Sequence, residues 1–291
     1  MKKILWLQTG GTMDCKITAD GLSPAPNVHI TVETDGVSYV SERLFSLDST
    51  ALTPRHWQLM AKKVFEAAIS GKYSGFVITH GTDTLQYSAA ALSLMLENIV
   101  QPVVFTGAMI PLGADNSDAP ANLSMAFAAA RDLPGGVYVA FAGKIIDGSS
   151  CIKLHTKDKD SFTDAGLPFR TVSAVPVLRD KLCEKVLYLK ITPVINNDIS
   201  DFILEKGYRG MICEGYGLGG ITDGFLEKLG ALVKSGVRVV VVSQCVYGGT
   251  DLNVYAAHKR ASDLGIEAWS MTGSAALVRL MIELGENLDR I

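Results

Sequence analysis

Short apolar runs alternate with segments of helical periodicity along most of this chain, and this alternation restricts the fold more than any other feature. The runs predict strands at residues 3–7, 37–47, 76–79, 102–106, 137–141, 186–190, 210–213 and 238–243. Helical spacing predicts helices at 54–68, 84–96, 121–131, 199–206, 224–235, 254–264 and 273–284. Strands that alternate with helices build a mainly parallel sheet covered by helices. We therefore expect an α/β protein of two such domains, a larger N-terminal catalytic domain over 1–180 and a smaller C-terminal domain over 186–291.

Two stretches interrupt the alternation. Residues 13–40 contain a run dense in turn-forming residues, Asp20–Asn27, and are expected to form a loop that serves as a lid or binding loop. Residues 143–176 are polar and are expected to be a solvated connection, followed by a linker at 175–184. One side chain of this connection, Lys153, is long enough to reach a crevice at the strand ends.

Two of the predicted strands end in the same way, with a glycine turn that presents a threonine. Gln8–Thr12 follows the first strand and places two adjacent glycines before Thr12. His80–Thr84 follows a later strand and presents Thr82 with Asp83 beside it. In an open α/β sheet, ligands bind outside the carboxyl ends of the strands. We therefore expect both hydroxyls at a ligand site.

Composition argues against several classes of function. The 291 residues carry a net charge of −3 without a basic tract, which argues against nucleic acid or an anionic membrane as a partner. No apolar run approaches the roughly 20 residues of a transmembrane helix, and Gln8 breaks the apolar start before it reaches the length of a signal peptide. The five cysteines are widely spaced, and the histidines show no metal-ligand spacing. We therefore expect a cytoplasmic protein with reduced thiols and no zinc site.

The glycine-rich segment Gly215–Gly220 fits the G-x-G-x-x-G pattern of dinucleotide-binding turns, after a strand and before a helix. Such a site requires an acidic residue about 20 positions later, at the end of the next strand. That strand ends in Val242–Gln244, without an acid. We therefore predict a tight glycine turn at a domain interface rather than a cofactor site. The signature of nucleoside triphosphate sites, G-x-x-x-x-G-K-[ST], is absent from the sequence.

The two glycine turns that present a threonine, Gln8–Thr12 and His80–Thr84, are called the threonine corners below. If they belong to a hydrolase, the threonines are its candidate nucleophiles, because the chain has no G-x-S-x-G elbow. A threonine hydroxyl becomes an effective nucleophile only when a neighbouring group takes its proton. Asp83, next to Thr82, and Lys153 are the candidate partners. Taken alone, each threonine is better explained as a turn residue or a helix N-cap, and Lys153 as a solvated charge. The two corners together favour a catalytic site.

Several segments resemble one family. Thr9–Met13 and His80–Leu85 resemble the two signatures of the bacterial-type L-asparaginase/glutaminase family. Asp48–Thr50 is similar to that family's substrate-carboxylate loop, Thr106–Met109 to its strand-end turn near the bound amide, and Lys153 to its catalytic lysine. The resemblance runs the full length of the chain and indicates a compact, cytoplasmic-type member. It implies no metal and no organic cofactor.

The resemblance implies amide hydrolysis. Thr12 is expected to attack the side-chain amide of L-asparagine and release ammonia, after which water hydrolyses the acyl-enzyme to aspartate, with some activity on glutamine as well. Thr82, Asp83 and Lys153 are expected to form a relay that activates a nucleophile or water. Ser49 is expected to donate to the substrate's α-carboxylate and Asp83 to hold its α-ammonium, while backbone N–H groups of the glycine corners stabilise the oxyanion. The expected substrate-binding residues are Gly11, Asp48, Ser49, Thr50, Gly81, Thr82, Asp83 and Ala108.

Several positions depart from the family pattern. Leu22 stands where many members carry a lid tyrosine, and Tyr39 lies beyond it. Leu218 and Ser274 stand where some members extend an asparagine or a glutamate from a neighbouring subunit. We therefore predict weaker substrate binding or an altered amide selectivity, with the chemistry retained. The resemblance also implies a homo-oligomer, either a dimer or a tetramer.

Two alternatives stay open. The glutaminase-like subunit of a tRNA-dependent amidotransferase resembles the same family but carries an extra N-terminal region, for which a first signature at Thr9 is expected to leave no room. A non-catalytic amino-acid sensor is favoured by the missing lid tyrosine and disfavoured by the retained Thr12, Thr82, Asp83 and Lys153. The preference between asparagine and glutamine depends on about one methylene of pocket depth, worth roughly 1–3 kcal/mol, and also stays open.

Overall fold

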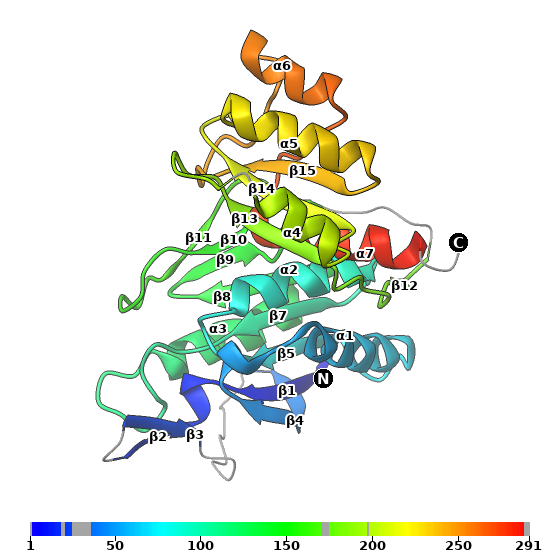
Figure 1. Cartoon of the computed structure of the whole chain (residues 1–291). Helices are drawn as coiled ribbons and strands as arrows, with labels where there is room; N and C mark the ends of the chain where they lie inside the picture. Colours follow the sequence, from blue (N-terminus) through cyan, green and yellow to red (C-terminus); the bar gives the residue numbers. More distant parts are fainter. Residues whose placement is uncertain (1, 19–20, 25–35, 170–174, 197, 288–291) are drawn as a thin grey trace. The chain divides into compact units, whose positions relative to one another are not determined.

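A computed structural model of the protein describes residues 2–18, 21–24, 36–169, 175–196 and 198–287 (Figure 1). The chain divides into two compact units. The first comprises Met1–Asp164 and Arg170–Asp180, and the second comprises Ala165–Phe169 and Lys181–Ile291. Each unit contains a mainly parallel sheet with helices, so the α/β fold class predicted from the alternation is confirmed.

The sheet of the first unit has six strands in the order β4-β1-β5-β7-β8-β9, and Figure 1 shows them stacked in this order. All neighbours pair in parallel except β8 and β9, which pair antiparallel. The bounds are β1 (Lys2–Gly10), β4 (Val37–Leu47), β5 (Gly75–Thr79), β7 (Pro102–Thr106), β8 (Gly136–Phe141) and β9 (Lys144–Asp147).

Helices cover both faces of this sheet. Successive strand residues point to opposite faces, and Ile4 and Trp6 of β1 lie in one core with α3 (Ala119–Asp132), where the rings of Trp6 and Phe127 are 5.7 Å apart. The opposite face carries equally buried apolar side chains and is covered by α1 (Pro54–Ile69) and α2 (Leu85–Met95). The sheet is thus buried on both faces, which leaves its strand ends as the accessible polar edge.

Part of the predicted loop over residues 13–40 is regular structure, so the loop prediction was wrong there. A short 3₁₀ turn (Thr12–Asp14) leads into an antiparallel hairpin of β2 (Cys15–Thr18) and β3 (Gly21–Pro24). Strands of four residues are too short for their periodicity to be distinguished from a loop. Residues 25–35 lie outside the described part of the chain.

The polar connection and the linker also contain short strands that the sequence analysis missed. Within the connection, β10 (Cys151–Lys153) pairs antiparallel with β11 (Phe162–Asp164). Within the predicted linker, β12 (Val177–Leu178) pairs with β6 (Leu96–Glu97). These strands have two or three residues each, and their partners are remote in the sequence or separated by polar residues, so no local pattern marks them.

The second unit contains a parallel sheet in the order β13-β14-β15-β16, with bounds Val186–Lys190, Gly210–Gly215, Arg238–Ser243 and Glu267–Ala268. Its helices are α4 (Ile199–Glu205), α5 (Asp223–Lys234), α6 (Ala256–Asp263) and α7 (Gly273–Glu286). Met211 of β14 and Val239 of β15 share a core with α4 and α5. Gly210 faces α7 so closely that a Cβ there would lie 2.7 Å from a methyl carbon of Leu284.

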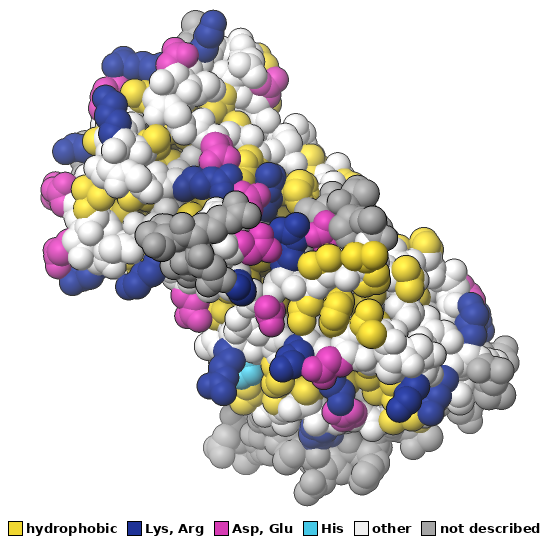
Figure 2. Space-filling model, turned by 90° about the vertical axis from the view of Figure 1, so that its right-hand side faces the viewer, with side chains coloured by type: hydrophobic (Ala, Val, Ile, Leu, Met, Phe, Trp, Pro, Cys, Tyr) yellow, Lys and Arg dark blue, Asp and Glu magenta, His cyan; other side chains and the backbone are white. Residues whose placement is uncertain are grey.

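Among the described residues, no helix combines the length and apolar character needed to cross a bilayer. On the face shown in Figure 2, lysine and arginine side chains are interspersed with aspartate and glutamate side chains. This mixed surface agrees with the near-balance of 27 basic and 30 acidic residues in the sequence.

Candidate functional site

A cavity of about 160 Å³ lies at the carboxyl ends of β1, β4 and β5 in the first unit. Its lining residues are Gly11, Thr12, Cys15, Asp48, Ser49, Gly81, Thr82 and Asp83. In the strand order β4-β1-β5-β7, the chain passes from β1 outward to its neighbour β4 at one edge of the sheet. It then returns to β5, on the other side of β1, and continues to β7 in the opposite direction. The cavity therefore occupies the topological switch point of the sheet, where open α/β proteins bind ligands.

Two glycine turns touch each other at this point. Gly11 has φ 90° and ψ −176°, a backbone conformation that is essentially restricted to glycine. A Cβ on Gly11 would lie 2.4 Å from the backbone nitrogen of Gly81, and a Cβ on Gly81 would lie 2.7 Å from Oγ of Ser49. The missing side chains let the turns after β1 and β5 pack backbone to backbone, and this contact brings Thr12 and Thr82 to one cavity.

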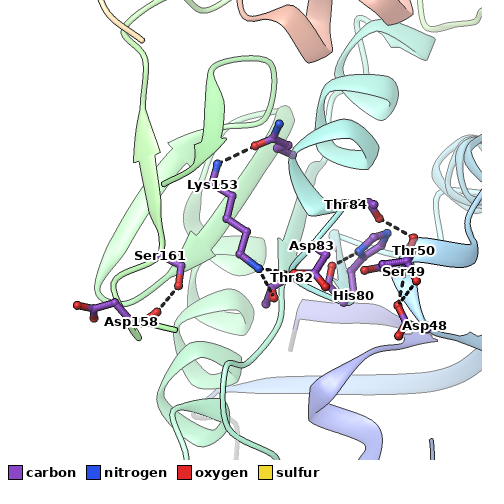
Figure 3. Close-up of polar contacts among 12 residues, drawn as sticks. Asp48, Ser49, Thr50, His80, Thr82, Asp83, Thr84, Lys153, Asp158 and Ser161 are labelled. Carbon is purple, nitrogen blue, oxygen red and sulfur yellow. Dashed lines mark hydrogen bonds and ion pairs between the residues drawn. The ribbon is translucent and has the colours of Figure 1, made fainter. Parts of the chain in front are cut away.

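Lys153 reaches this edge from β10 (Figure 3). Its Nζ donates to Oγ1 of Thr82 at 2.9 Å and to Oδ1 of Asp83 at 2.6 Å. The backbone N–H of Lys153 donates to Oε1 of Gln86 at 2.7 Å, which fixes the start of the lysine side chain. The lysine side chain is 13% exposed and that of Asp83 is 62% exposed. The three groups therefore form a continuous polar chain from a shielded amine to a solvent-facing carboxylate.

Asp48 begins the 3₁₀ turn Ser49–Ala51 at the end of β4. Its carboxylate accepts from the backbone N–H and the hydroxyl of Thr50, both at 2.8 Å, and these bonds lower the pKa of Asp48 below its usual value. Asp48 is therefore ionised at neutral pH. The carbonyl of the buried Ser49 accepts from the hydroxyl of Thr84 at 2.9 Å, so the Asp48 turn is tied directly to the turn that carries Thr82.

His80 is fully buried beneath this turn and serves its structure. Burial lowers the pKa of His80 to about 4, so the imidazole is neutral at pH 7. As a neutral ring it donates from Nδ1 to the carbonyl oxygen of Gly81, 2.7 Å away. Its ring also packs edge-on against Phe105, with the centroids 5.8 Å apart. The histidine thus supports the glycine backbone without presenting a charge to the cavity.

The structure brings most of the predicted site residues together. Those that line the cavity are Gly11, Thr12, Asp48, Ser49, Gly81, Thr82 and Asp83. Lys153 contacts two of them. Thr50 is exposed and acts on the site through its bonds to Asp48. Ala108 is fully buried in the core that contains α3, and it is not among the described residues lining the cavity.

Three residues of the site went unnoticed in the sequence analysis. Cys15 lines the cavity, Gln86 holds Lys153, and Asp118 holds the turn after β7. The carboxylate of Asp118 accepts from the backbone N–H groups of Met109 at 3.0 Å and Ile110 at 2.9 Å. Only Cys15 had a usable signal, since it follows Thr12 by three residues and a 3₁₀ turn has three residues per turn.

The positions that depart from the family pattern fall in different places. Tyr39 lies in β4, and its ring packs 5.8 Å from Trp6 and 5.3 Å from Phe127, in the core facing α3. It therefore serves packing and is no substitute for a lid tyrosine. Leu22 belongs to β3.

The G-x-G-x-x-G segment of the second unit forms the tight turn that was predicted. The backbone N–H of Tyr216 donates to the carbonyl of Gly220 at 2.8 Å, and the N–H of Gly220 donates back to Tyr216 at 2.7 Å. At Gly219, with φ +111°, a Cβ would lie 2.8 Å from Thr250. In the part of the chain that the structure describes, no three histidine, cysteine, aspartate or glutamate side chains are grouped to hold a metal ion.

Two family models match this chain. The model described as "Asparaginase, N-terminal" matches residues 3–176, and the one described as "Glutaminase/Asparaginase C-terminal domain" matches residues 185–290. The chain belongs to the asparaginase family. The resemblance inferred from the two threonine signatures is thereby confirmed, and with it an amidohydrolase class of chemistry.

Individual members of the asparaginase family are similar over most of the chain. An L-asparaginase of Thermococcus kodakarensis is 34% identical over 312 residues, covering 99% of this chain and 94% of the relative. A glutamyl-tRNA(Gln) amidotransferase subunit of Pyrococcus abyssi is 34% identical over 283 residues, covering 85% of this chain but only 63% of that subunit. Among solved structures, the thermostable L-asparaginase from T. kodakarensis has a TM-score of 0.87 at 33% identity, covering 97% of this chain and 93% of its own. L-asparaginase I from Vibrio cholerae has a TM-score of 0.84 at 29% identity, covering 98% and 93%.

Proposed function

We propose that this chain is an L-asparagine amidohydrolase that works through a threonine nucleophile, with a secondary activity on glutamine. The observation that carries the proposal is that Thr12 and Thr82 line the same cavity, with Lys153 bonded to Thr82 and Asp83. Thr12 supplies a hydroxyl nucleophile. Thr82 supplies a second hydroxyl, and Lys153 supplies an amine that can exchange a proton with it. The similarity to the L-asparaginase of T. kodakarensis supports the choice of substrate.

In the first half-reaction, Oγ1 of Thr12 attacks the carbon of the side-chain amide. The O–C bond forms, the C–N bond breaks, and the leaving nitrogen takes up a proton and departs as ammonia. The proton of Thr12 passes to a base in the cavity. Backbone N–H groups at Gly11 and Gly81 stabilise the oxyanion, because they are fixed by the contact between the two turns and require no rearrangement.

In the second half-reaction, water attacks the acyl-enzyme, aspartate leaves and Thr12 regains its proton. In this proposal the hydroxyl of Thr82 relays a proton to Lys153, whose Nζ lies 2.9 Å away, and Asp83, 2.6 Å from the same Nζ, stabilises the charge that forms on the lysine. The relay serves as the base for water or for the nucleophile.

Substrate recognition uses the polar rim of the cavity. Ser49 donates its hydroxyl to the α-carboxylate, and the solvent-facing Asp83 holds the α-ammonium by a charge-assisted hydrogen bond. Asp48, held ionised by Thr50, adds negative charge to the lining of the cavity. Ala108, in the turn after β7, is buried against the core that contains α3 and supports the turn from that side.

Assembly and location complete the proposal. We infer a homo-oligomer, a dimer or tetramer, from the resemblance to a family in which some members extend a side chain into a neighbouring subunit's site, although Leu218 and Ser274 differ from the residues that do so. We place the protein in the cytoplasm, which agrees with the free cysteines Cys15, Cys151, Cys183, Cys213 and Cys245.

A second candidate function is that of an ammonia-producing component of an amidotransferase. The 34% identity to the P. abyssi amidotransferase subunit favours it, and the chain spans 63% of that subunit's length. Under this proposal glutamine is the preferred ammonia donor and asparagine a poor one. The two candidates therefore predict opposite ratios of ammonia release from the two amides.

Ammonia release from the purified full chain, measured with asparagine and with glutamine, tests the proposal. We expect turnover of asparagine in the wild type and a loss of at least about 10³-fold in Thr12→Ala. Thr12→Ser is the matched control, since it keeps a hydroxyl and should retain measurable turnover. Release from neither amide, combined with asparagine binding that Thr12→Ala leaves unchanged, would establish a sensor instead.

A further inference from the structure

Cys15 occupies a defined place in the wall of the cavity. It follows the 3₁₀ turn Thr12–Asp14, and its backbone N–H donates to the carbonyl of Thr12. Residues three apart in such a turn lie on the same side, which agrees with both Thr12 and Cys15 lining the cavity. The thiol donates to the carbonyl of Gly11, with Sγ 3.3 Å from the oxygen. The sulfur is therefore anchored beside the proposed nucleophile.

The surroundings keep this thiol protonated. Burial raises the pKa of Cys15, and the carboxylates of Asp14 and Asp48 raise it further. Asp14 is 1% exposed, and the guanidinium of Arg43 lies 4.0 Å from its carboxylate. Because reactive cysteines are thiolates, Cys15 is neither a nucleophile nor a base at neutral pH. It presents a neutral, polarizable surface to whatever fills the cavity.

We propose that Cys15 is a specificity-determining residue, whose thiol contacts the side chain of the bound amide and limits its length. This inference rests on the proposed amidohydrolase function. Among the described lining residues, the other side chains carry hydroxyl or carboxylate groups and the glycines carry none. Beside the methyl groups of Thr12 and Thr82, Cys15 is thus the described lining side chain that carries no oxygen atom, in a cavity of about 160 Å³. Asparagine and glutamine differ by one methylene, for which pockets discriminate by roughly 10–200-fold.

Substitutions of Cys15 that change its size test the proposal through the ratio of kcat/KM for glutamine to kcat/KM for asparagine. We expect Cys15→Ala to raise this ratio about tenfold and Cys15→Val to lower it by a similar factor. Cys15→Ser keeps the shape of the side chain and a terminal heteroatom slightly smaller than sulfur, and should leave the ratio within about threefold of the wild type. The control is Cys245→Ala, since Cys245 is exposed in the second unit. A purely structural role would change both substrates equally, so an unchanged ratio in both Cys15→Ala and Cys15→Val overturns the proposal.

Protection from labelling gives a second readout that does not depend on turnover. Methyl methanethiosulfonate converts a thiol to a mixed disulfide and releases methanesulfinate, and peptide mass mapping reports the rate at each cysteine. We expect slow labelling of Cys15 that L-aspartate suppresses at least about fivefold, with no change at Cys245. If Cys15 resists the reagent without aspartate, or reacts equally fast with it, the proposal is overturned.

The two readouts separate this proposal from the function it rests on. If neither amide is hydrolysed but aspartate still protects Cys15, the amidohydrolase proposal fails while the contact between Cys15 and a bound amino acid stands. If asparagine is hydrolysed but both the substrate ratio and the labelling rate are unaffected, only the proposal for Cys15 fails.

Discussion

Both parallel sheets of this chain end in polar side chains, but these side chains have different roles in the two units. At the carboxyl ends of the first sheet, two glycine turns touch, and Thr12 and Thr82 face a cavity. At the carboxyl ends of the second sheet, the amide of Gln244 donates to the carbonyls of Ile191 and Glu214, at 2.7 Å each. The strand-end hydroxyls of the first unit thus line a cavity, whereas the strand-end amide of Gln244 in the second unit is bonded to its own sheet.

The largest effect that we expect from this comparison is a loss of turnover when Lys153, at the strand ends of the first unit, is replaced. Lys153→Met removes the proton acceptor next to Thr82 while keeping the length of the side chain. We expect turnover of asparagine to fall by about 10²–10⁴-fold. Lys144→Met is the matched control, because Lys144 pairs with Asp160 at 2.6 Å in an exposed ion pair worth about 0–1 kcal/mol. Turnover in Lys153→Met above about a tenth of the wild-type value would exclude lysine from the relay.

The next effect concerns the glycine turns of the two units. Gly11→Ala would place a Cβ 2.4 Å from Gly81 in a conformation that excludes side chains. We expect a loss of about 2–5 kcal/mol in the free energy of unfolding, together with loss of turnover. Gly217→Ala is the control from the second unit, since Gly217 has φ +50° and open space around it, and should lose about 1–2 kcal/mol. Urea unfolding of both variants measures the difference; equal losses would contradict a special role for the contact between the turns.

These contrasts also explain what the sequence could predict. The helix α1 begins at Pro54 after the N-cap Thr53, as predicted, because caps act through the few residues around them. The two threonine corners could also be predicted from the sequence, since a glycine turn at a strand end is a local feature. The hairpin strands β2 and β3 and the pair β6–β12 were missed because such short strands depend on partners and not on their own pattern.

Within the site, contacts between remote residues were the unpredictable part. Gln86 and Lys153 are 67 positions apart, and nothing in either segment marks the bond between them. Asp118 precedes α3, where it would ordinarily cap the helix, yet its carboxylate reaches back to Met109 and Ile110. Such bonds follow from the tertiary arrangement alone, so the sequence indicated which residues do the chemistry but not which residues hold them in place.

A smaller effect is expected on stability at acid pH, because the buried imidazole of His80 makes the free energy of unfolding of the first unit depend on pH. Its pKa is about 4 in the folded chain against 6.5 for the free side chain, so the unfolded state takes up a proton first as the pH falls. The contribution to stability is complete above pH 6.5 and is lost as the pH falls towards 4, by up to roughly 3 kcal/mol. Urea unfolding between pH 7.5 and 4 measures this slope. His80→Gln should flatten it, whereas the control His155→Gln, at an exposed position, should not.

The smallest effect should appear at the strand ends of the second unit, and only in the free energy of unfolding. The hydroxyl of Tyr188 donates to Oε1 of Glu214 at 2.5 Å, where α7 begins so close that a Cβ on Gly273 would overlap the hydroxyl. Tyr188→Phe should lower the free energy of unfolding by about 1–2 kcal/mol, because it leaves a half-buried carboxylate without this donor. The control Tyr208→Phe removes a hydroxyl that has no hydrogen-bond partner among the described residues and should cost less than about 0.5 kcal/mol. Turnover of asparagine should be unchanged in both; a large loss of turnover in Tyr188→Phe would show that the strand ends of the second unit take part in the chemistry and would remove the distinction between the two units.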